Sequence, residues 1–325
     1  MGFMRHDLYP LLFKPVYQNY PWGGMRIPRT FNRPLPPGIY AESWEIADHE
    51  DGMSVVLNGV YAGKTLRELL RIHGARILGS KIEGKRFPLL IKIIDAREKL
   101  SVQVHPNDET AARFGGDPKT EMWYLLGDND AQVYCGFKDG ITKERFIQAV
   151  EEGTSGETMQ PVPVSKGDVV FVRGGNVHAI DAGCLILEIQ QNSNTTYRIY
   201  DWGRMGNDGK PRDLHIEQAI NVINWNEAAT PLTAPELLVD TDTLQRWKML
   251  QCEYFHLDKL VFTAPLEVPL DGTTFHALFV AEGEAQISWP DGELFAPAGT
   301  SILVPAALPA YTLEGKATVL RTTIP

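Results

Sequence analysis

Residues 167–178 of this 325-residue chain read Gly167-Asp-Val-Val-Phe-Val-Arg-Gly-Gly-Asn-Val-His178. The apolar run from Val169 to Val172 predicts a β-strand, and the two glycines that follow it predict a tight turn. His178 then begins the next strand. Because a strand directs alternate side chains to opposite faces, this imidazole can point into a β-protein, where a metal ligand is useful.

A second segment, Ser101-Val-Gln-Val-His-Pro106, offers an amide and an imidazole at strand spacing. Gln103 and His105 are two residues apart, so a strand directs both side chains to the same face. Glu121 follows within Lys119-Thr-Glu-Met-Trp-Tyr-Leu-Leu126, another predicted strand. One glutamine, two histidines and one glutamate form a ligand set that a divalent metal of borderline softness accepts. The sequence therefore predicts a metal site built from distant strands.

Composition limits the classes to which the protein can belong. Its 325 residues, 43% of them hydrophobic, suffice for a full core and predict two domains. A formal net charge of −10 argues against nucleic acid as a partner. No segment has the length and apolarity of a membrane span and the N-terminus lacks an apolar signal segment, so we expect a cytoplasmic protein. Cys135, Cys184 and Cys252 lack any paired spacing and are interpreted as buried apolar residues.

Periodicity and turn residues predict many strands and a few helices. Helices are expected at residues 65–78, 108–114, 143–152 and 216–222, the second of them capped by Asn107 or Asp108. Strands are expected at residues 13–16, 41–47, 53–57, 89–94, 169–172 and 185–190, with a proline-rich loop at 28–37. Later residues alternate as in a sandwich or barrel, with strands at 275–281, 285–289, 301–304 and 318–322.

The glycine, strand and turn that precede His178 resemble the second motif of the cupin family. Arg173 stands where that motif usually has a proline. The resemblance implies a mainly β fold of two cupin-type (jelly-roll) β-barrels with a few added α-helices. Residues 1–235 would form the metal-binding catalytic domain with helical insertions. Residues 236–325 would form a degenerate cupin-like domain with a structural role, because no histidine follows the echo of the motif at Gly299–Pro305.

Motifs along nearly the whole chain resemble those of type I mannose-6-phosphate isomerases (phosphomannose isomerases) of the short bacterial form. Lys14-Pro-Val, Tyr20-Pro-Trp-Gly-Gly24, Glu42-Ser-Trp-Glu-Ile46 and Leu100-Ser-Val-Gln-Val-His-Pro-Asn107 follow one another in the family's order. The most specific motif is Leu185-Ile-Leu-Glu-Ile-Gln-Gln-Asn-Ser-Asn-Thr-Thr-Tyr-Arg-Ile-Tyr-Asp-Trp-Gly-Arg204. The resemblance implies interconversion of mannose 6-phosphate and fructose 6-phosphate, so the expected partner is a small sugar phosphate.

The family resemblance also implies roles for particular residues. One zinc ion per chain would be held by Gln103, His105, Glu121 and His178. Arg198 would be the arginine needed for turnover, Lys119 and Glu188 would line the active site, and Ser101 and Arg204 would meet the phosphate. The need for cations around a phosphate dianion makes Lys92 a further candidate for that contact. Two positions depart from the family. Asn194 replaces an aspartate and Ile180 replaces the tyrosine of longer relatives, so neither position supplies a base or a phenol.

The chemistry of an aldose–ketose isomerase suits these residue types. The reaction moves a proton between C1 and C2 through a cis-enediolate, whose negative charge needs a nearby cation. Arg198 stays protonated at neutral pH, so its expected role is electrostatic. Lys119 and Glu188 are both candidates for the proton carrier, and the sequence does not choose between them.

Two other classes of function compete with this one. A cupin oxidoreductase that uses Fe(II) would favour several histidines with open coordination positions, whereas Gln103 favours a redox-silent metal. A noncatalytic sugar-phosphate-binding cupin would have no need of the charges at Lys119, Glu121 and Arg198. The sequence does not report the oligomeric state, the pathway served or the activity on unphosphorylated sugars.

Overall fold

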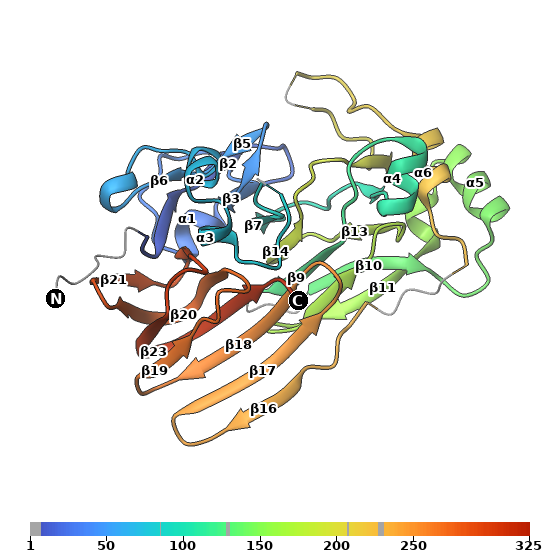
Figure 1. Cartoon of the computed structure of the whole chain (residues 1–325). Helices are drawn as coiled ribbons and strands as arrows, with labels where there is room; N and C mark the ends of the chain where they lie inside the picture. The colour runs from blue at the N-terminus through green and yellow to red at the C-terminus, as the bar shows by residue number, and fades with distance from the viewer. Residues whose placement is uncertain (1–7, 85, 128–130, 207, 227–230) are drawn as a thin grey trace. The chain divides into compact units, whose positions relative to one another are not determined.

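The computed structural model describes residues 8–84, 86–127, 131–206, 208–226 and 231–325. This part of the chain is mainly β-structure with short α-helices, as Figure 1 shows, which confirms the predicted fold class. Contacts group the chain into two compact units. The first holds the N-terminal residues up to Val16 together with Glu45–Pro88 and Ala234–Pro325, and the second holds Tyr17–Trp44 and Leu89–Thr233.

This grouping differs from the predicted division after residue 235. The N-terminal strand β1 (Leu11–Lys14) pairs with β22 (Ser301–Val304) and with β6 (Val55–Val56), all within the first unit. Main-chain hydrogen bonds therefore attach early residues to C-terminal strands. A division by sequence position does not capture such pairing, because strands distant along the chain become neighbours in a sheet.

Two sheets are built mainly from residues of the second unit. The five-stranded sheet has the order β11-β10-β13-β8-β15, with strands Met159–Val164, Ala131–Phe137, His178–Ile180, Val102–Val104 and Tyr197–Tyr200. The six-stranded sheet has the order β12-β9-β14-β7-β3-β2, with strands Val169–Val172, Glu121–Leu125, Leu185–Gln191, Leu89–Asp95, Glu42–Ile46 and Val16–Gln18. Apolar side chains from both sheets, among them Ile94, Val133 and Ile186, meet in one buried cluster. Two sheets packed around a shared core form the expected jelly-roll layer arrangement.

The central strands of the six-stranded sheet are mostly apolar but contain a few charged side chains. All seven residues of β7 are buried, and most of them are branched aliphatic residues that favour a strand. Lys92 of β7 is aligned with Glu188 of β14, and Glu188 is aligned with Trp123 of β9. Since aligned residues on neighbouring strands face the same side, the register alone brings these three side chains together.

Short helices connect the strands of the second unit. They are α1 (Arg26–Thr30), α4 (Asp108–Phe114), α5 (Lys143–Glu151) and α6 (Ile216–Val222), with a 3₁₀ turn at Ser155–Thr158. The helix α4 begins as predicted, because the Asn107 side chain accepts a hydrogen bond from the backbone N–H of Thr110 at 2.8 Å and the Thr110 hydroxyl accepts one in return. α4 occupies about half of the sequence between His105 and Glu121, and the last three residues of α1 fall within the segment that we expected to be a loop.

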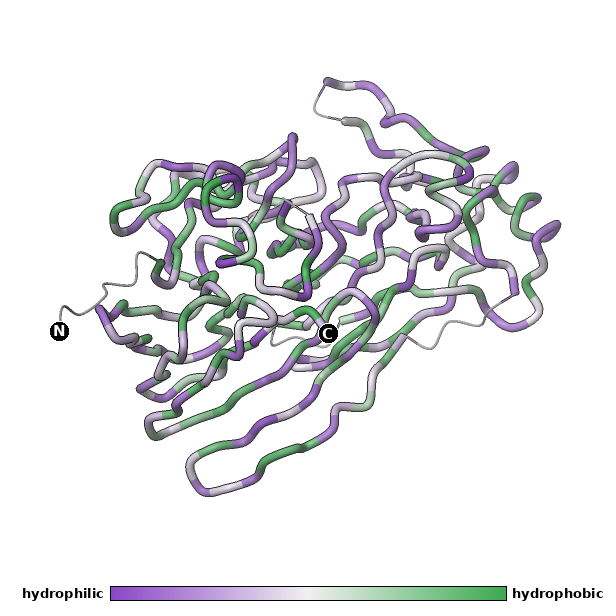
Figure 2. Tube along the Cα trace, viewed as in Figure 1, coloured by the Kyte–Doolittle hydropathy of each residue, from purple (hydrophilic) through white to green (hydrophobic). Residues whose placement is uncertain are grey.

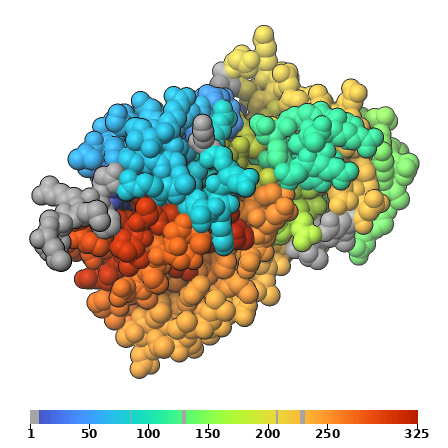
Figure 3. Space-filling model, in the orientation of Figure 1, coloured from blue at the N-terminus to red at the C-terminus, as the bar shows by residue number. Residues whose placement is uncertain are grey.

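The first unit is built on a ten-stranded sheet. Its main path is β16-β17-β18-β23-β20-β22-β1-β6, with β19 paired to β23 and β21 paired to β20. The remaining bounds are β16 Glu236–Asp240, β17 Leu244–Gln251, β18 His256–Phe262, β19 Leu266–Pro269, β20 His276–Trp289, β21 Gly292–Pro297 and β23 Ala310–Thr323. A small separate sheet joins β4 (Asp48–His49) and β5 (Gly52–Met53). Apolar residues of the large sheet form a second core cluster, and β16 lies at the surface (Figure 3).

Two predictions for the first unit place the ends of elements wrongly: two predicted strands are one strand, and one predicted helix is two helices. The strands expected at 275–281 and 285–289 are one strand, β20, whose register with β23 shifts between Val280 and Glu282. The helix expected at 65–78 is divided into α2 (Leu66–His73) and α3 (Ala75–Leu78) by Gly74, whose φ is 35°. A 3₁₀ turn at Gly59–Tyr61 precedes them.

Hydrophobic stretches along the chain are short and alternate with hydrophilic residues (Figure 2). Among the described residues, no helix combines the length and the apolarity that crossing a membrane requires.

Candidate active site

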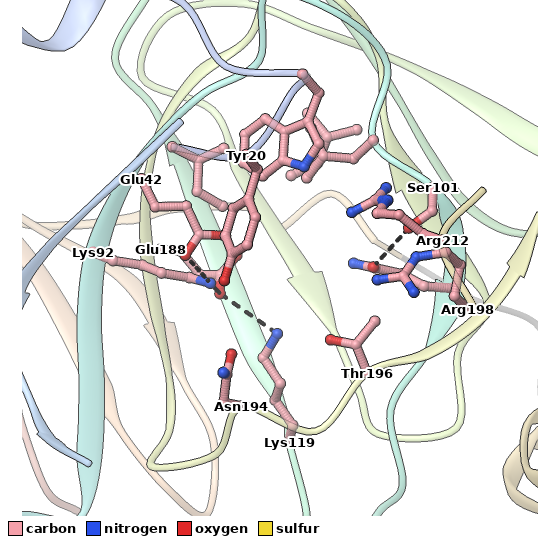
Figure 4. A pocket seen from close by; sticks show the side chains of 15 residues that line it. Tyr20, Glu42, Lys92, Ser101, Lys119, Glu188, Asn194, Thr196, Arg198 and Arg212 are labelled. Carbon is pink, nitrogen blue, oxygen red and sulfur yellow. Dashed lines mark hydrogen bonds and ion pairs between the residues drawn. The ribbon is translucent and has the colours of Figure 1, made fainter. Parts of the chain in front are cut away.

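The second unit contains a pocket with a volume of about 240 Å³. Figure 4 shows that its charged side chains gather in two groups. Glu42, Lys92, Lys119 and Glu188 lie on one side, and Ser101, Arg198 and Arg212 lie on the other. The first group comes mostly from the six-stranded sheet, and the second comes from β15 and from segments next to β8 and β15.

Three of the predicted metal ligands converge beside this pocket. The ligand atoms of His105, Glu121 and His178 lie within 4.8 Å of one another, and all three residues are buried. The Glu121 carboxylate is 3.5 Å from Nε2 of His105 and 3.4 Å from Nε2 of His178. Gln103, aligned with His178 across β8 and β13, places its amide nitrogen 3.3 Å from Nε2 of that histidine. The structure thus brings the four predicted ligands together from both sheets.

Both histidines have the protonation state that a metal requires. Burial and the nearby Lys119 ammonium hold the pKa of His105 well below its usual value, and burial lowers the pKa of His178 to about 4. Nδ1 of His178 lies 2.8 Å from the backbone oxygen of Asn176. Because a carbonyl oxygen only accepts hydrogen bonds, Nδ1 carries the proton and Nε2 keeps a lone pair toward Glu121.

The cluster fits a divalent cation. Burial and the Glu188 carboxylate raise the pKa of Glu121 to about 7, so this carboxylate lacks sufficient positive charge around it. A cation among Glu121, His105 and His178 would supply that charge. Two neutral imidazoles, a carboxylate and an amide are the donors of a borderline metal rather than of magnesium or calcium, which prefer all-oxygen sites.

A buried ion-pair network forms the wall of the pocket. Nζ of Lys92 lies 3.3 Å from the Glu42 carboxylate and 3.2 Å from the Glu188 carboxylate. Trp44 donates its indole N–H to Glu42 at 2.7 Å, and Trp123 donates its indole N–H to Glu188 at 3.0 Å. These two tryptophans are fully buried. Each carboxylate is therefore fixed by one ammonium and one indole, and its orientation toward the pocket is set.

Lys119 connects this network to the metal-type cluster. Its Nζ lies 2.9 Å from the Glu121 carboxylate, 3.1 Å from Nε2 of His105 and 3.8 Å from the Glu188 carboxylate. Burial alone would raise the pKa of Glu188, but the charges of Lys92 and Lys119 lower it below its usual value. Burial alone would lower the pKa of Lys92, but Glu188 and Glu42 raise it above its usual value. Glu188 is therefore ionised at neutral pH, as is Lys92.

Two guanidinium groups lie at the other side of the pocket. Arg198 on β15 is aligned with Gln103 of β8 and donates from Nη1 to the backbone oxygen of Asp213 at 2.8 Å. Arg212 donates from Nε and Nη2 to the two carboxylate oxygens of Asp201 at 2.7 and 2.6 Å. Burial and the charge of Arg212 lower the pKa of Arg198. Within the described part of the chain, Nε of Arg198 is buried without a hydrogen-bond partner.

Arg204, which we expected to meet the phosphate, does not line this pocket, although its Nη1 lies 4.0 Å from the Asp201 carboxylate that holds Arg212. It donates to the backbone oxygen of Lys99, and its Nε lies 3.8 Å from the Glu98 carboxylate. It borders a different hollow, lined by Glu98, Lys99, Trp202 and Arg204. The cause is local, because Trp202 and Gly203 both adopt the left-handed conformation, with φ of 58° and 69°. The turn with these two residues leaves Arg204 outside the lining of the pocket, and its phosphate contact stays a prediction.

Several pocket residues were not identified from the sequence, namely Tyr20, Glu42, Thr196 and Arg212. Arg212 reaches the site because Met205 pairs with Pro211 in a β-bridge, which returns the chain to Asp201. No local pattern signals such a return. Both positions that depart from the family, Asn194 and Ile180, do line the pocket, and Tyr20 supplies a phenol there from another segment.

Known proteins are similar to this chain in sequence and in fold. Residues 11–137 match the family described as phosphomannose isomerase type I, catalytic domain, and residues 246–324 match the mannose-6-phosphate isomerase cupin domain. Mannose-6-phosphate isomerase ManA of Bacillus subtilis is 39% identical over 95% of this chain and 96% of its own length. Mannose-6-phosphate isomerase of Streptococcus mutans is 32% identical over 94% of this chain and 95% of its own length.

Solved structures agree with these matches. The crystal structure of mannose 6-phosphate isomerase from Bacillus subtilis superimposes with a TM-score of 0.88 at 31% identity, covering 96% of this chain and 99% of that one. A phosphomannose isomerase from Salmonella typhimurium, at 17% identity and a TM-score of 0.79, shares the fold. Fold and pocket thus define an isomerase of the cupin class. The chain belongs to the type I mannose-6-phosphate isomerase family.

Proposed function

We propose that the chain interconverts mannose 6-phosphate and fructose 6-phosphate through a cis-enediolate, with one zinc ion as cofactor. The observation that carries the proposal is a single pocket with a metal-type cluster and a buried carboxylate on one side and two guanidinium groups on the other. Isomerisation of a sugar phosphate needs a proton carrier, a cation for the enediolate and an anchor for the phosphate. The pocket contains side chains suited to each of these tasks.

The proposed zinc ligands are Gln103, His105, Glu121 and His178. When bound, zinc supplies a Lewis acid that polarises the oxygens at C1 and C2 of the sugar. The neutral imidazoles support this assignment, because they leave a net positive charge on a centre with one carboxylate ligand.

Glu188 is the proposed proton carrier between C1 and C2. A base needs an unprotonated oxygen or nitrogen at neutral pH, and the lowered pKa of Glu188 keeps its carboxylate ionised. Lys119 is instead the cation of an ion pair with Glu121 at 2.9 Å. Its proposed role is to orient Glu121 and to donate a hydrogen bond to the substrate. Lys92 and Trp123 hold Glu188 in place.

Arg198 is proposed to stabilise the enediolate. It is aligned with the metal ligand Gln103, and its Nε has no partner among the described residues, so a donor is available for a developing negative charge. The phosphate would lie beyond it, between Ser101 and Arg212. The Asp201 carboxylate holds Arg212 by two hydrogen bonds, which fixes a planar donor group for a phosphate.

Arg212→Ala is expected to raise KM for mannose 6-phosphate about 10- to 100-fold, the equivalent of one or two charge-assisted hydrogen bonds. The comparison variant is Arg204→Ala, which removes the same charge from outside the pocket lining and, because it leaves both hydrogen bonds between Arg212 and Asp201 in place, is expected to raise KM less than Arg212→Ala does. Steady-state kinetics of both variants give the comparison. A larger increase of KM in Arg204→Ala than in Arg212→Ala would contradict this assignment and would place the phosphate at Arg204.

The reaction itself is tested by an assay that couples formation of fructose 6-phosphate from mannose 6-phosphate to a dye or nicotinamide signal. We expect turnover by the zinc-loaded protein and no consumption of oxygen. Oxygen uptake without isomerisation would favour a cupin oxidoreductase. Binding of mannose 6-phosphate without turnover, seen by calorimetry, would favour a noncatalytic sugar-phosphate-binding protein.

A further inference from the structure

The first unit has a charged cavity of its own, with a volume of about 480 Å³. It lies along four neighbouring strands, β17, β18, β23 and β20. On one face of these strands, Leu260, Leu278 and Val319 are part of the apolar core. The residues aligned with two of them are charged, because Arg246 is aligned with Leu260 and Arg321 is aligned with Leu278. The side chains on this face of the sheet thus change from apolar to charged at the cavity.

The ionic part is centred on Asp258, which is 2% exposed. One of its carboxylate oxygens accepts from Arg246 at 3.0 Å and also from Arg321. The other oxygen lies 2.9 Å from Nε2 of His256. Burial alone would raise the pKa of Asp258, but the hydrogen bonds from His256 and Arg321 lower it, so the carboxylate is ionised.

The charges of this cluster do not balance. Two guanidinium groups share one carboxylate oxygen, so a single negative charge faces two positive charges in a partly buried place. The Nε atoms of Arg246 and Arg321 are buried and have no hydrogen-bond partner among the described residues. Buried donors of this kind are normally satisfied, and unpaired positive charge in a cavity favours an anion.

The other titratable groups at the cavity leave this excess in place. Lys81 and Asp271 both line it and carry opposite charges that interact with each other. Burial lowers the pKa of His276 to about 3, so its imidazole is neutral, and its Nδ1 lies 3.0 Å from the Tyr311 hydroxyl. Asp258, Arg246 and Arg321 together therefore carry one net positive charge, and the neutral imidazole of His276 lies at the same cavity.

We propose that this cavity binds a small phosphate-bearing molecule between Arg246 and Arg321. Guanidinium groups match the oxygens of a phosphate with pairs of parallel hydrogen bonds, and the anion would satisfy the Nε donors that Asp258 leaves unused. The proposed reaction uses none of these residues. The site is thus a second, non-catalytic anion site within the first unit, and it gives the degenerate cupin domain a ligand-binding role.

The experiment is a calorimetric titration of the full-length, zinc-loaded protein with inorganic phosphate at constant ionic strength. We expect two phosphate ions per chain, one at each site, with dissociation constants below about 1 mM. Arg321→Gln is expected to weaken binding at the proposed site at least about tenfold, because it removes a charge-assisted pair. Arg246→Gln should act in the same way. Each variant leaves Asp258 with one arginine and His256, so folding is retained, and melting curves check this.

The matched control is Lys259→Gln, which removes a cation from the neighbouring position of β18, where Lys259 stacks on Trp247, and should leave binding unchanged. Arg212→Ala removes only the phosphate site of the second unit, so the two assignments fail independently. Equal affinity in the wild type, Arg321→Gln and Arg246→Gln would overturn the proposal. Tighter binding of succinate than of phosphate would overturn the assignment to a phosphate.

Discussion

His178→Ala is expected to lower kcat/KM at least about 1000-fold, because the metal contributes several kcal/mol of charge stabilisation in the transition state. His178 is fully buried, and its Nε2 faces the Glu121 carboxylate at 3.4 Å. Its loss removes one of only two nitrogen ligands in the cluster. The zinc content, measured by mass spectrometry on the same sample, is expected to fall well below one ion per chain.

His49→Ala is a suitable control for this variant. His49 lies on β4 in the first unit and pairs with Asp51 at 3.5 Å, outside the metal-type cluster. We expect it to keep its zinc and its turnover. Circular dichroism melting separates loss of metal from loss of fold. A His178→Ala protein that retains both a full zinc complement and normal kinetics would remove this histidine from the ligand set.

Glu188→Gln is expected to lower kcat about 100- to 10,000-fold with little change in KM, the usual contribution of a general base. The substitution keeps the shape of the side chain and a carbonyl oxygen that can accept from Trp123. It removes the ability to take up a proton together with the negative charge that pairs with Lys92. In deuterated water, the wild type should incorporate deuterium at C2 of mannose 6-phosphate. Glu188→Gln should lose this exchange together with turnover.

Glu42→Gln tests whether the loss of kcat expected for Glu188→Gln comes only from removing a negative charge beside Lys92. Glu42 shares Lys92 with Glu188 and accepts from a buried tryptophan in the same manner, so removing its charge disturbs the network to a similar extent. We expect a loss in kcat below about tenfold, within the range of a perturbed ion pair rather than of a missing base. Should Lys119→Met abolish deuterium exchange while Glu188→Gln retains it, Lys119 is the base.

Elements with local signals could be predicted from the sequence. Asn107 and Thr110 form a capping pair that depends on four consecutive residues, so α4 begins where the sequence indicates. The continuity of longer elements was harder to predict, because it depends on partners distant in sequence. Between Val280 and Glu282 the strand β20 shifts its register against β23 without ending, whereas the sequence pattern there resembles a turn.

The same distinction applies to the site. Gln103 and His105 are recognisable because strand periodicity fixes their relative direction, and the family motifs indicate Glu121 and His178. Arg204 illustrates the limit of this approach, since its place in a motif does not reveal that it lines a different hollow. Arg212 enters the pocket only because a bridge folds its segment back toward Asp201, and no sequence periodicity reports such a contact.

The proposed ligands come from both layers of the second unit, since β8 and β13 belong to one sheet and β9 to the other. An ion held among them would cross-link the two sheets. Its binding free energy would add to that of folding, by about 4 kcal/mol when the free ion exceeds its dissociation constant a thousandfold. A cell starved of the metal would then lose more than catalytic rate, because each polypeptide would also have a shorter lifetime before proteolysis.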